Sequence, residues 1–402
     1  MTASSRRVLF VAEAVTLAHV TRPLVLARSL DAAQHEIHFA CAPGYENFLV
    51  EDTFTQWPLW SIPPSQFLEA LARGRPLYDQ ATLERYIEAD LELLDAVKPD
   101  LVVGDFRLSL AVSAAVRKIP YAALTNAHWS PYSRLGPIPL PEHLLARIVG
   151  VTAATLMFRA VSPLVFTLHA AALNRLRRRY GLSSLGDLRH AYTHGDYTLF
   201  ADTPNLVPTT QLPANHHYIG PVLWSPQVDL PAWWAELPQE QPIVYVTLGS
   251  SGKVTLLPDI AAELDQLPVV AAVATAGRID PEALPKGIRA TAYLPGQAVA
   301  RRAQLVICNG GSATVYQALA EGTPVLGIAS NMDQHLTMQA VKRAGAGILL
   351  RAGQADRRAI RESVQALLTT PSYREAAGRV ATEFASFDVN SRFPSFVNTH
   401  FG

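Results

Sequence analysis

The stretch from residue 305 to 347 limits most strongly how this chain can fold. Leu305–Cys308 is a short apolar run of the kind that a buried parallel strand needs. It ends at Asn309-Gly310-Gly311-Ser312, and the following residues, Ala313–Glu321, have helical character. The two glycines let a ligand approach the backbone closely, and the start of the helix offers unpaired N–H groups and the positive end of its dipole. This order predicts an α/β sheet with an anion site that suits a diphosphate.

Further polar residues follow along the same stretch. Ser312 and Thr314 can cap the helix or donate to a phosphate, and Gly322-Thr323-Pro324 stops the helix before a strand at Val325–Ile328. Asp333-Gln334 then follows at the carboxyl end of that strand, where open α/β sheets bind ligands, and this pair suits sugar hydroxyls. A plainer interpretation stays open, in which the glycines form only a tight turn and the acid–amide pair only starts a helix.

The series of features resembles the donor-binding signature of nucleotide-sugar glycosyltransferases of the GT-B fold, which reads roughly HGGxGT, about ten residues, then GxPxxxxPxxxDQ. This family includes plant UDP-glycosyltransferases and bacterial antibiotic and macrolide glycosyltransferases. Asn309 stands where the family has a phosphate-binding His, Ala313 where it has a Gly, and Thr337 near where an Asn follows the DQ pair. A carboxamide can still donate to a phosphate oxygen, although it is never cationic. The resemblance implies an α/β fold of GT-B architecture, with two Rossmann-like doubly wound domains facing across a cleft.

The length of the chain agrees with two domains, because 402 residues are too many for one compact core. A proline-rich piece that ends near Pro242 is the clearest linker. We therefore expect an acceptor-binding domain over residues 1–222, a linker over 223–241 and a nucleotide-sugar-binding domain over 242–372. The resemblance implies that a helical segment over 373–402 crosses back to the first domain.

The charge and cysteine content narrow the possible partners and the compartment. Lys+Arg and Asp+Glu both number 34, so no overall field favours nucleic acid or an anionic membrane. Cys41 and Cys308 lie in apolar, strand-like contexts, which predicts buried free thiols and a reducing cytoplasm. Met1–Arg7 is short and polar and leads directly into the apolar run Val8–Ala12, so we expect no secretory signal.

The most apolar long stretch of the chain is Leu144–Leu173. Arg147, Arg159, Pro163 and His169 interrupt it, and a helix that spans a lipid bilayer would not readily accept them. We expect a buried or amphipathic helix here. An acceptor pocket lined by the helix and peripheral contact with a membrane surface stay open as alternatives.

The N-terminal half begins with a βαβ pattern, in which the strands Val8–Ala12 and Ile37–Ala42 enclose a helix from about His19 to Leu30. The sequence AHVTRPLVLARSL around His19 resembles the family context GHxxPxxxLAxxL, whose His is the catalytic base. Asp105-Phe106 follows a later strand and resembles the family acid that hydrogen-bonds this base. The resemblance implies that His19 and Asp105 form a catalytic pair. Two alternatives remain: Asp105 as a helix cap, and Glu13 in the same loop as the base.

Acceptor contacts are expected in the same half of the chain. The segment Glu51–Leu77 holds several prolines and tryptophans, as an irregular loop that shapes a pocket would. We expect Phe67, Phe106, His128 and Trp129 to contact the acceptor. A purely structural role for His128 is an equal alternative.

Donor contacts are expected in the second half. Gly249-Ser250-Ser251 follows a strand at Ile243–Leu248 and resembles the family loop that touches the donor phosphates. Ala292-Tyr293-Leu294-Pro295 resembles the family segment WxPQ that cradles the nucleotide base, with Gly296 in place of the Gln. The predicted donor-binding residues are Gly249, Ser250, Ser251, Leu294, Pro295, Asn309, Gly310, Gly311, Ser312, Thr314, Asp333 and Gln334.

Together these features predict an inverting glycosyltransferase that moves a sugar from a UDP- or dTDP-sugar to a hydroxyl of a small hydrophobic acceptor, such as a natural product, a polyketide or a lipid-like molecule. No metal-ligand spacing is present, so we expect neither a metal nor another cofactor. Two alternatives are a sugar-nucleotide epimerase or hydrolase on the same fold and a non-catalytic homologue that binds a nucleotide or assists a partner enzyme.

Overall fold

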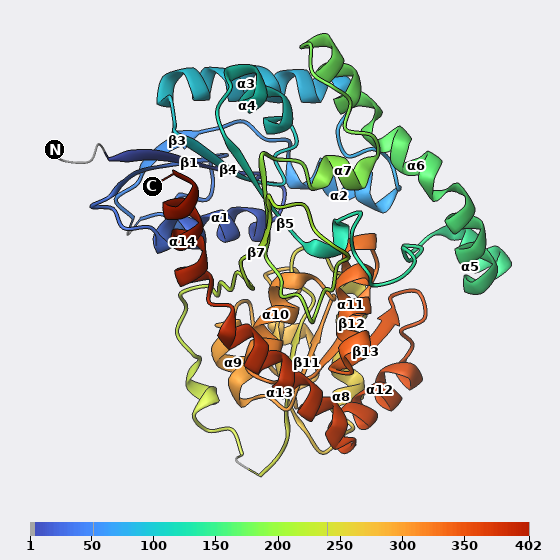
Figure 1. Cartoon of the computed structure of the whole chain (residues 1–402). Coiled ribbons are helices and arrows are strands. Elements are labelled where there is room, and N and C mark those ends of the chain that lie inside the picture. Colours follow the sequence, from blue (N-terminus) through green and yellow to red (C-terminus); the bar gives the residue numbers. More distant parts are fainter. Residues whose placement is uncertain (1–4, 51, 239, 402) are drawn as a thin grey trace. The chain divides into compact units, whose positions relative to one another are not determined.

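The structure is a computed structural model that describes residues 5–50, 52–238 and 240–401, apart from the side chains of residues 144, 145 and 147. Residues 1–4 and 51 of the first predicted domain, residue 239 of the predicted linker and residue 402 of the predicted C-terminal segment therefore lie outside the described residues. The chain divides into two compact units, the first with residues 1–134, 158–222 and 387–402 and the second with residues 135–157 and 223–386. Figure 1 labels the elements of both units.

Within the described residues of the first unit, seven parallel strands form one sheet in the order β3-β2-β1-β4-β5-β6-β7. The strands are β1 (Arg6–Ala12), β2 (His35–Cys41), β3 (Thr55–Pro58), β4 (Leu101–Asp105), β5 (Tyr121–Thr125), β6 (Tyr197–Phe200) and β7 (His216–Tyr218). The helices are α1 (Leu17–Ser29), α2 (Pro64–Ala72), α3 (Gln80–Val97), α4 (Leu110–Arg117), α6 (Val151–Arg179), α7 (Leu188–Tyr192) and α14 (Val389–Phe401), with 3-10 turns η1 (Glu46–Phe48) and η2 (Ala127–Trp129). Residues 151–157 of α6 cluster with the second unit and the rest of the helix with the first.

Both faces of this sheet are covered by helices, because the side chains of β1 alternate between two apolar clusters. Val8 and Phe10 pack with residues of α1 and α14, whereas Leu9 and Val11 pack with residues of α3 and α4. Figure 1 shows α3 and α4 on one side of the sheet and α1 on the other. The arrangement leaves the carboxyl ends of the strands as the edge at which polar residues can gather.

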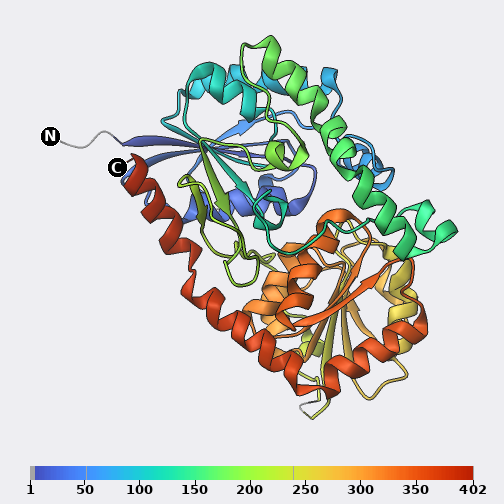
Figure 2. The ribbon, with the colours of Figure 1, turned by 45° about the vertical axis from the view of Figure 1, so that its right-hand side comes forward.

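The second unit repeats the architecture, with six parallel strands among its described residues in the order β10-β9-β8-β11-β12-β13. The strands are β8 (Ile243–Thr247), β9 (Val270–Ala274), β10 (Arg289–Thr291), β11 (Leu305–Cys308), β12 (Val325–Ala329) and β13 (Gly347–Arg351). The helices are α5 (Leu144–Val149), α8 (Leu257–Leu264), α9 (Gly296–Arg302), α10 (Ser312–Ala320), α11 (Met332–Ala344), α12 (Arg357–Thr369) and α13 (Pro371–Ser386), with 3-10 turns η3 (Ala232–Trp234), η4 (Val254–Leu256) and η5 (Pro281–Ala283). The strands of both sheets are seen together in Figure 2.

The two compact units do not correspond to a single cut of the chain near residue 222, where the first predicted domain ends. Residues 135–157 cluster with the second unit. Arg351 on β13 explains this, since its guanidinium donates to the carbonyl oxygens of Leu140 and Pro141 at 2.9 Å each and pairs with Glu142 at 3.1 Å. At the C-terminus, α13 clusters with the second unit and α14 with the first.

The prediction of an irregular loop over residues 51–77 is wrong. This segment contains β3, which pairs in parallel with β2, and the helix α2. The prolines mark the ends of these elements: Pro58 is the last residue of β3, and Pro64 is the first residue of α2, where its missing N–H costs no hydrogen bond.

The apolar stretch at 144–173 forms α5 and most of α6. Pro163 lies inside α6 and cannot donate to the carbonyl oxygen of Arg159, and the Ser162 hydroxyl donates to that oxygen instead at 3.2 Å. Among the described residues, α6 is the one helix long and apolar enough to cross a membrane by length and composition. Only 11% of its most apolar window is buried, so of the two expected forms, a buried or an amphipathic helix, the fully buried one does not apply to this window.

One buried histidine should make the second unit sensitive to acid. Burial, with a contribution from the charge of Arg351, lowers the pKa of His335 from 6.5 to about 4. Between these pH values the unfolded chain binds a proton that the folded chain does not, so stability is lost as the pH falls from 6.5 to 4. The shift corresponds to about 3 kcal/mol.

The test is urea unfolding of the second unit at several pH values for the wild type and for His335→Leu. As the pH falls from 7 to 4.5, we expect the wild type to lose more unfolding free energy than His335→Leu does. The exposed His190→Leu serves as the control and should follow the wild-type pH dependence. A His335→Leu curve parallel to the wild type would show that His335 is protonated in the folded state.

Candidate active site

His19 lies near the start of α1, directly after the loop that follows β1. The helix begins at Leu17, two residues earlier than expected, and the His19 N–H donates to the carbonyl oxygen of Thr16 at 3.2 Å. The imidazole is 19% exposed, so a small molecule can reach it. The carboxyl edge of the first sheet therefore presents an accessible imidazole, a side chain that can serve as a general base.

Asp105 holds this ring from the neighbouring strand. It is the last residue of β4 and lies opposite Ala12, the last residue of β1, in the parallel register. Its Oδ1 is 2.9 Å from Nδ1 of His19, and its carboxylate is fully buried. A proton on Nδ1 that is donated to this carboxylate leaves Nε2 as the nitrogen that can accept a proton. The geometry of the pair is that of an oriented general base.

Arg22 is a third member of this group, and the sequence reasoning missed it. Its Nε donates to Oδ2 of Asp105 at 2.7 Å and its Nη2 donates to Oδ1 at 2.6 Å, in a two-pronged ion pair that is almost completely buried. Burial alone would raise the pKa of Asp105, but the charges of Arg22 and His19 outweigh it and lower the pKa below its ordinary value of 3.8. Asp105 therefore stays ionised.

The Arg22 side chain is itself fixed from the next strand. Its Nη1 donates to Oδ1 of Asn126 at 2.7 Å, and the Asn126 amide donates to Asp202 at 3.1 Å. All these groups are buried, so the acid, the arginine and the amide hold one arrangement. Residue 22 is where the family motif has its Pro, and this departure was the available signal.

Aromatic rings lie against the imidazole. Phe106 has a left-handed backbone conformation with φ of 61°, which is strained for a non-glycine residue, and its ring stacks on His19 with centroids 4.8 Å apart. Two further rings pack edge-to-face against Phe106, with centroid distances of 6.0 Å for Phe67 and 5.0 Å for Tyr192. The ring of Tyr192 in turn packs edge-to-face against Trp129, with centroids 5.0 Å apart. Tyr192, at the end of α7, was not predicted. The structure brings Phe67, Phe106 and Trp129 into one cluster. Phe67 is only 6% exposed, whereas the rings of Phe106, Trp129 and Tyr192 are half-buried and offer a surface that suits a hydrophobic or aromatic molecule.

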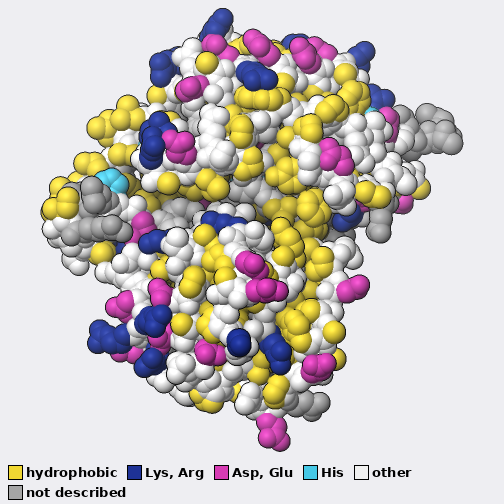
Figure 3. Space-filling model, turned by 180° about the vertical axis from the view of Figure 1, so that it is seen from behind, with side chains coloured by type: hydrophobic (Ala, Val, Ile, Leu, Met, Phe, Trp, Pro, Cys, Tyr) yellow, Lys and Arg dark blue, Asp and Glu magenta, His cyan; other side chains and the backbone are white. Residues whose placement is uncertain are grey.

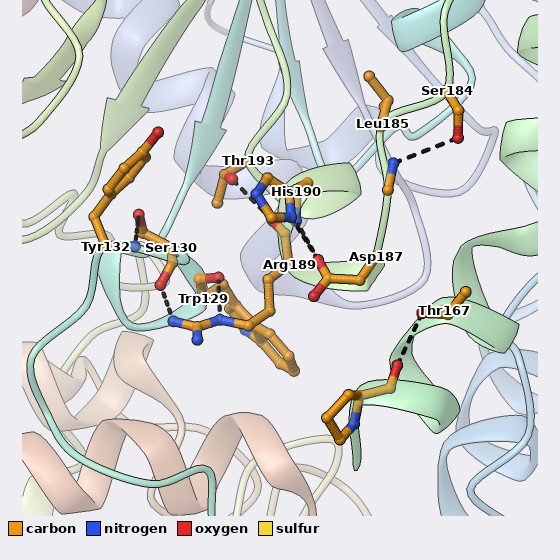
Figure 4. A network of polar contacts seen from close by, with 12 residues as sticks. Trp129, Ser130, Tyr132, Thr167, Ser184, Leu185, Asp187, Arg189, His190 and Thr193 are labelled. Atoms are coloured by element: carbon orange, nitrogen blue, oxygen red, sulfur yellow. Dashed lines mark hydrogen bonds and ion pairs between the residues drawn. The ribbon is translucent and has the colours of Figure 1, made fainter. Parts of the chain in front are cut away.

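The segment that carries Trp129 is held by α7. Figure 4 shows Arg189 reaching the carbonyl oxygens of Trp129, at 3.3 Å, and of Ser130. Asp187 caps α7 by accepting from the backbone N–H of His190 at 3.1 Å. The fourth predicted acceptor residue, His128, is 2% exposed and so presents almost none of its side chain to a ligand.

Glu13, the alternative base, is locked into a separate buried cluster. The Tyr86 hydroxyl donates to its Oε1 at 2.6 Å, and Nη1 of Arg107 is 3.3 Å from its Oε2. Arg107 also pairs with Asp90 at 2.8 Å, and all three charged side chains are fully buried. Burial raises the pKa of Glu13, although Arg107 opposes the shift. A carboxylate with these partners and no exposure cannot reach an acceptor hydroxyl, so the geometry favours His19.

A small apolar cavity in the first unit adjoins the aromatic cluster. Tyr192 lines it, together with Tyr78, Leu108 and three residues of α6, His169, Ala170 and Leu173. None of the four predicted acceptor residues lines this cavity. Tyr192 connects the two, because it lies against Phe106 on one side and lines the cavity on the other.

The predicted anion site lies in the second unit at the start of α10. Gly310 has φ of 81°, and a Cβ there would lie 2.7 Å from Met338, so both conformation and space require glycine. Gly311 is the N-cap with an ordinary φ of −72° and leaves the helix start without a side-chain cap. Ser312 and Thr314, in the first turn, are half-buried. The uncapped N–H groups of this turn are available to an anion.

Asn309 ties two loops together. Its Oδ1 accepts from the N–H of Gly311 at 3.1 Å, and its Nδ2 donates to the hydroxyl of Ser251 at 3.1 Å. Both polar atoms of the carboxamide are thus engaged within the protein. The residue that replaces the family His joins the turn after β11 to the loop after β8.

The guanidinium of Arg278 bonds to the loop that follows β8. Gly249 has φ of 57° and Ser250 is exposed. Nη1 of Arg278 donates to the carbonyl oxygens of Gly249 at 3.0 Å and Gly252 at 2.8 Å. Sequence reasoning missed Arg278, which places a positive charge beside the predicted phosphate loop.

Asp333 and Gln334 lie in the first turn of α11, which starts near the carboxyl end of β12. Gln334 forms a capping box with Asn331, and its Oε1 accepts from the N–H of Ser330 at 2.8 Å. Its amide group is therefore occupied in stabilising the helix start, as in the plainer interpretation, whereas Asp333 is half-buried. A sugar contact from either side chain stays a prediction.

The predicted base-binding residues occupy the loop between β10 and α9. Leu294 is buried and Pro295 is the N-cap of α9, so neither offers a polar side chain. Tyr293, in the same segment that resembles the family's base-binding WxPQ, is 55% exposed. An exposed ring at the carboxyl edge of a parallel sheet can stack on a planar base. Within the part of the chain that the structure describes, no group of three or more His, Cys, Asp or Glu could hold a metal ion.

Comparisons with known proteins give this geometry a context. The family model for the C-terminal domain of erythromycin biosynthesis protein CIII-like proteins matches residues 255–390. A PGL/p-HBAD biosynthesis rhamnosyltransferase of Mycobacterium bovis is 49% identical over 99% of this chain and 88% of its own length. A second M. bovis protein, named an inactive PGL/p-HBAD biosynthesis glycosyltransferase, is 52% identical over 63% of this chain and 70% of its own length.

Solved structures show the same fold at lower identity. The spinosyn rhamnosyltransferase SpnG in complex with thymidine diphosphate superposes with a TM-score of 0.69 at 19% identity, covering 98% of this chain and 99% of its own. Its structure with the spinosyn aglycone gives a TM-score of 0.68. The prediction of a GT-B glycosyltransferase architecture with two parallel-sheet α/β domains is confirmed.

Proposed function

This chain belongs to the family of PGL/p-HBAD biosynthesis glycosyltransferases, and we propose that it transfers a sugar, with inversion, from a nucleoside-diphosphate sugar to a hydroxyl on a hydrophobic, aromatic acceptor. The observation that carries the proposal is the oriented His19–Asp105 pair, 2.9 Å apart, with its ring stacked on Phe106.

Removal of the acceptor proton and attack on the sugar occur together in this proposal. His19 takes the proton on Nε2 while the acceptor oxygen attacks the anomeric carbon, and the ionised Asp105 stabilises the imidazolium. Direct attack by the acceptor breaks the bond to the diphosphate in a single displacement, which inverts the anomeric configuration.

Departure of the diphosphate is assisted by the second unit. Charge that gathers on the leaving oxygens is stabilised by the uncapped N–H groups of α10, by its dipole and by the loop at Gly249–Ser251. We propose that this stabilisation needs no metal ion. Tyr293 would stack on the nucleobase.

The acceptor is proposed from the aromatic surface around His19. Phe67, Phe106, Tyr192 and Trp129 form a continuous series of ring contacts that favours a planar, apolar acceptor. A phenol is a favourable nucleophile because its pKa of about 10 makes proton transfer to an imidazole far easier than from an aliphatic alcohol.

The proposed donor sugar is rhamnose on thymidine diphosphate. A relative that covers nearly the whole chain is named a rhamnosyltransferase, and a protein of the same fold has been solved with thymidine diphosphate. The test is incubation with dTDP-rhamnose and 4-substituted phenols, followed by mass spectrometry. A rhamnoside is expected, whereas release of free rhamnose alone would indicate a hydrolase.

The anion site is tested by Gly311→Val. Residue 311 has a backbone conformation that valine adopts, and a Cβ there approaches nothing closer than 3.4 Å, so the fold should persist while the side chain fills space that the diphosphate needs. We expect loss of the thermal stabilisation by thymidine diphosphate that the wild type shows, which is about 2.7 kcal/mol at one hundred times Kd.

Gly378→Val, at a helical glycine with open space around it, is the matched control and should bind normally. Wild-type affinity in folded Gly311→Val protein would remove the basis for this donor site.

A further inference from the structure

Helix α6 carries an exposed apolar stripe that the proposed reaction does not use. Met157, Val161, Leu164 and Leu168 recur at the spacing of one helix face and are 50–63% exposed. Leu156 on the same half of the helix is 59% exposed. Large apolar side chains that stand this far out of a folded protein in a continuous row mark a surface that contacts something other than water.

The charge of the helix is as uneven as its polarity. The chain as a whole has equal numbers of acidic and basic residues, yet residues 151–179 contain five arginines and no Asp or Glu. Arg175 and Arg178 continue the apolar stripe at helical spacing, and Arg159 lies within the apolar half. These three are exposed, and among the described residues none forms an ion pair with a carboxylate. In Figure 3, by contrast, basic and acidic side chains are mixed over much of the face in view.

The opposite face of α6 is fixed to the first unit. Phe166, Ala170, Leu173 and Leu176 are buried, and the last three belong to the apolar cluster that includes Phe67 and Tyr86. A helix whose C-terminal half is packed on the protein in this way does not cross a bilayer, although its length and composition would allow it. It can lie in the plane of a membrane surface, with apolar side chains among the acyl chains and arginines at the headgroups.

We propose that the exposed face of α6 binds peripherally to a lipid bilayer that contains anionic lipids. The apolar stripe supplies the contact with the acyl region, and the three exposed arginines that form no ion pair among the described residues supply charge complementarity to the headgroups. This goes beyond the proposed reaction and does not depend on it. The inner face of α6, at His169, Ala170 and Leu173, lines the cavity beside Tyr192. If the proposed reaction and the membrane contact both hold, a hydrophobic acceptor dissolved in the bilayer meets this helix.

The first experiment is flotation of the full chain with vesicles of phosphatidylcholine alone and with 30% phosphatidylglycerol. We expect binding to the mixed vesicles, weaker binding to the neutral ones, and partial loss in high salt. The variant Met157→Gln/Leu164→Gln/Leu168→Gln should bind on the order of 100-fold more weakly. Arg175→Gln and Arg178→Gln should each weaken binding to the anionic vesicles about fivefold.

Val228→Gln/Leu230→Gln, which changes exposed apolar residues elsewhere, is the matched control and should bind as the wild type does. All the changed side chains are exposed, so thermal unfolding should be unaffected, and this is checked for each variant. If the triple variant floats with the vesicles as well as the wild type does, or if the wild type binds neither vesicle, the proposal is overturned. If size-exclusion chromatography shows a dimer that the triple variant loses while vesicle binding is absent, the face contacts a second copy instead.

The second experiment locates the contact. Cys41 and Cys308 are buried, and burial raises the pKa of each thiol to about 12, so an engineered surface cysteine can be labelled selectively. An environment-sensitive fluorophore on Leu164→Cys should shift to the blue when anionic vesicles are added, and the same label on Ala32→Cys, in an exposed turn before β2, should not. Equal shifts at both positions would contradict binding through α6.

Discussion

His19→Ala should lower kcat about 10²–10⁴-fold while leaving the affinity for the nucleotide donor nearly unchanged. The base acts only in the transition state, and the predicted diphosphate contacts all lie in the other unit of the chain. Binding and chemistry are therefore expected to separate. The measurements are single-turnover rates with a working donor and acceptor, and donor affinity by titration.

His190→Ala provides the matched control, since His190 forms a similar His–Asp contact of 2.7 Å with Asp187 on an exposed helix. It should leave kcat close to that of the wild type. A His19→Ala enzyme that works at the wild-type rate would show that another group is the base. Loss of donor affinity in proportion to activity would instead give His19 a structural role.

Asp105→Asn should damage both catalysis and folding. The amide cannot stabilise an imidazolium, so kcat should fall about as far as in His19→Ala, and the double variant should be little worse because the two residues act as a unit. The buried guanidinium of Arg22 also loses its carboxylate, and removal of one partner of a buried ion pair costs about 3–5 kcal/mol.

The stability effect should depend on pH in a defined direction. Because the pKa of Asp105 is lowered below 3.8 in the folded chain, its contribution is present above that value and is lost as the pH falls through the lower folded pKa. The difference in unfolding free energy between the wild type and Asp105→Asn should therefore shrink only below about pH 4.

Asp95→Asn is the control for this comparison. Asp95 makes the same two-pronged contact with Arg117, at 2.6 Å for both bonds, but on the exposed surface. It should change the melting temperature little. Equal melting temperatures for Asp105→Asn and the wild type would contradict the ion-pair account of Arg22.

The elements that were predicted correctly are those whose apolar runs are bounded by turn residues. Leu305–Cys308 was placed to the residue, because a parallel strand buried on both faces reads as a short continuous apolar run. The strand expected over Pro99–Phe106 is Leu101–Asp105, which is shorter at both ends. The prediction for residues 51–77 was wrong because β3 is an edge strand. Three of its four residues are exposed, so Thr55–Pro58 shows no continuous apolar run.

The candidate site was only partly accessible from the sequence. The contact between His19 and Asp105 was predicted through the resemblance, and the parallel register of β1 and β4 explains it. Arg22 and Tyr192 were not placed in the same way, since Arg22 joins the site through a buried ion pair with Asp105 and Tyr192 through ring contacts with Phe106 and Trp129. The bonds of Asn309 to Gly311 and Ser251 were not foreseen, and its expected contact with a phosphate stays a prediction. No periodicity in a sequence reports such side-chain partners.

The most direct test of the proposed mechanism is the anomeric configuration of the product. Purified wild-type enzyme is given dTDP-rhamnose and a 4-substituted phenol, and the glycoside is analysed by nuclear magnetic resonance. A single displacement driven by His19 predicts one anomer, opposite in configuration to the donor, whose formation falls at least about 100-fold in His19→Ala. A product that retains the donor configuration, or one formed at the same rate without His19, would contradict it.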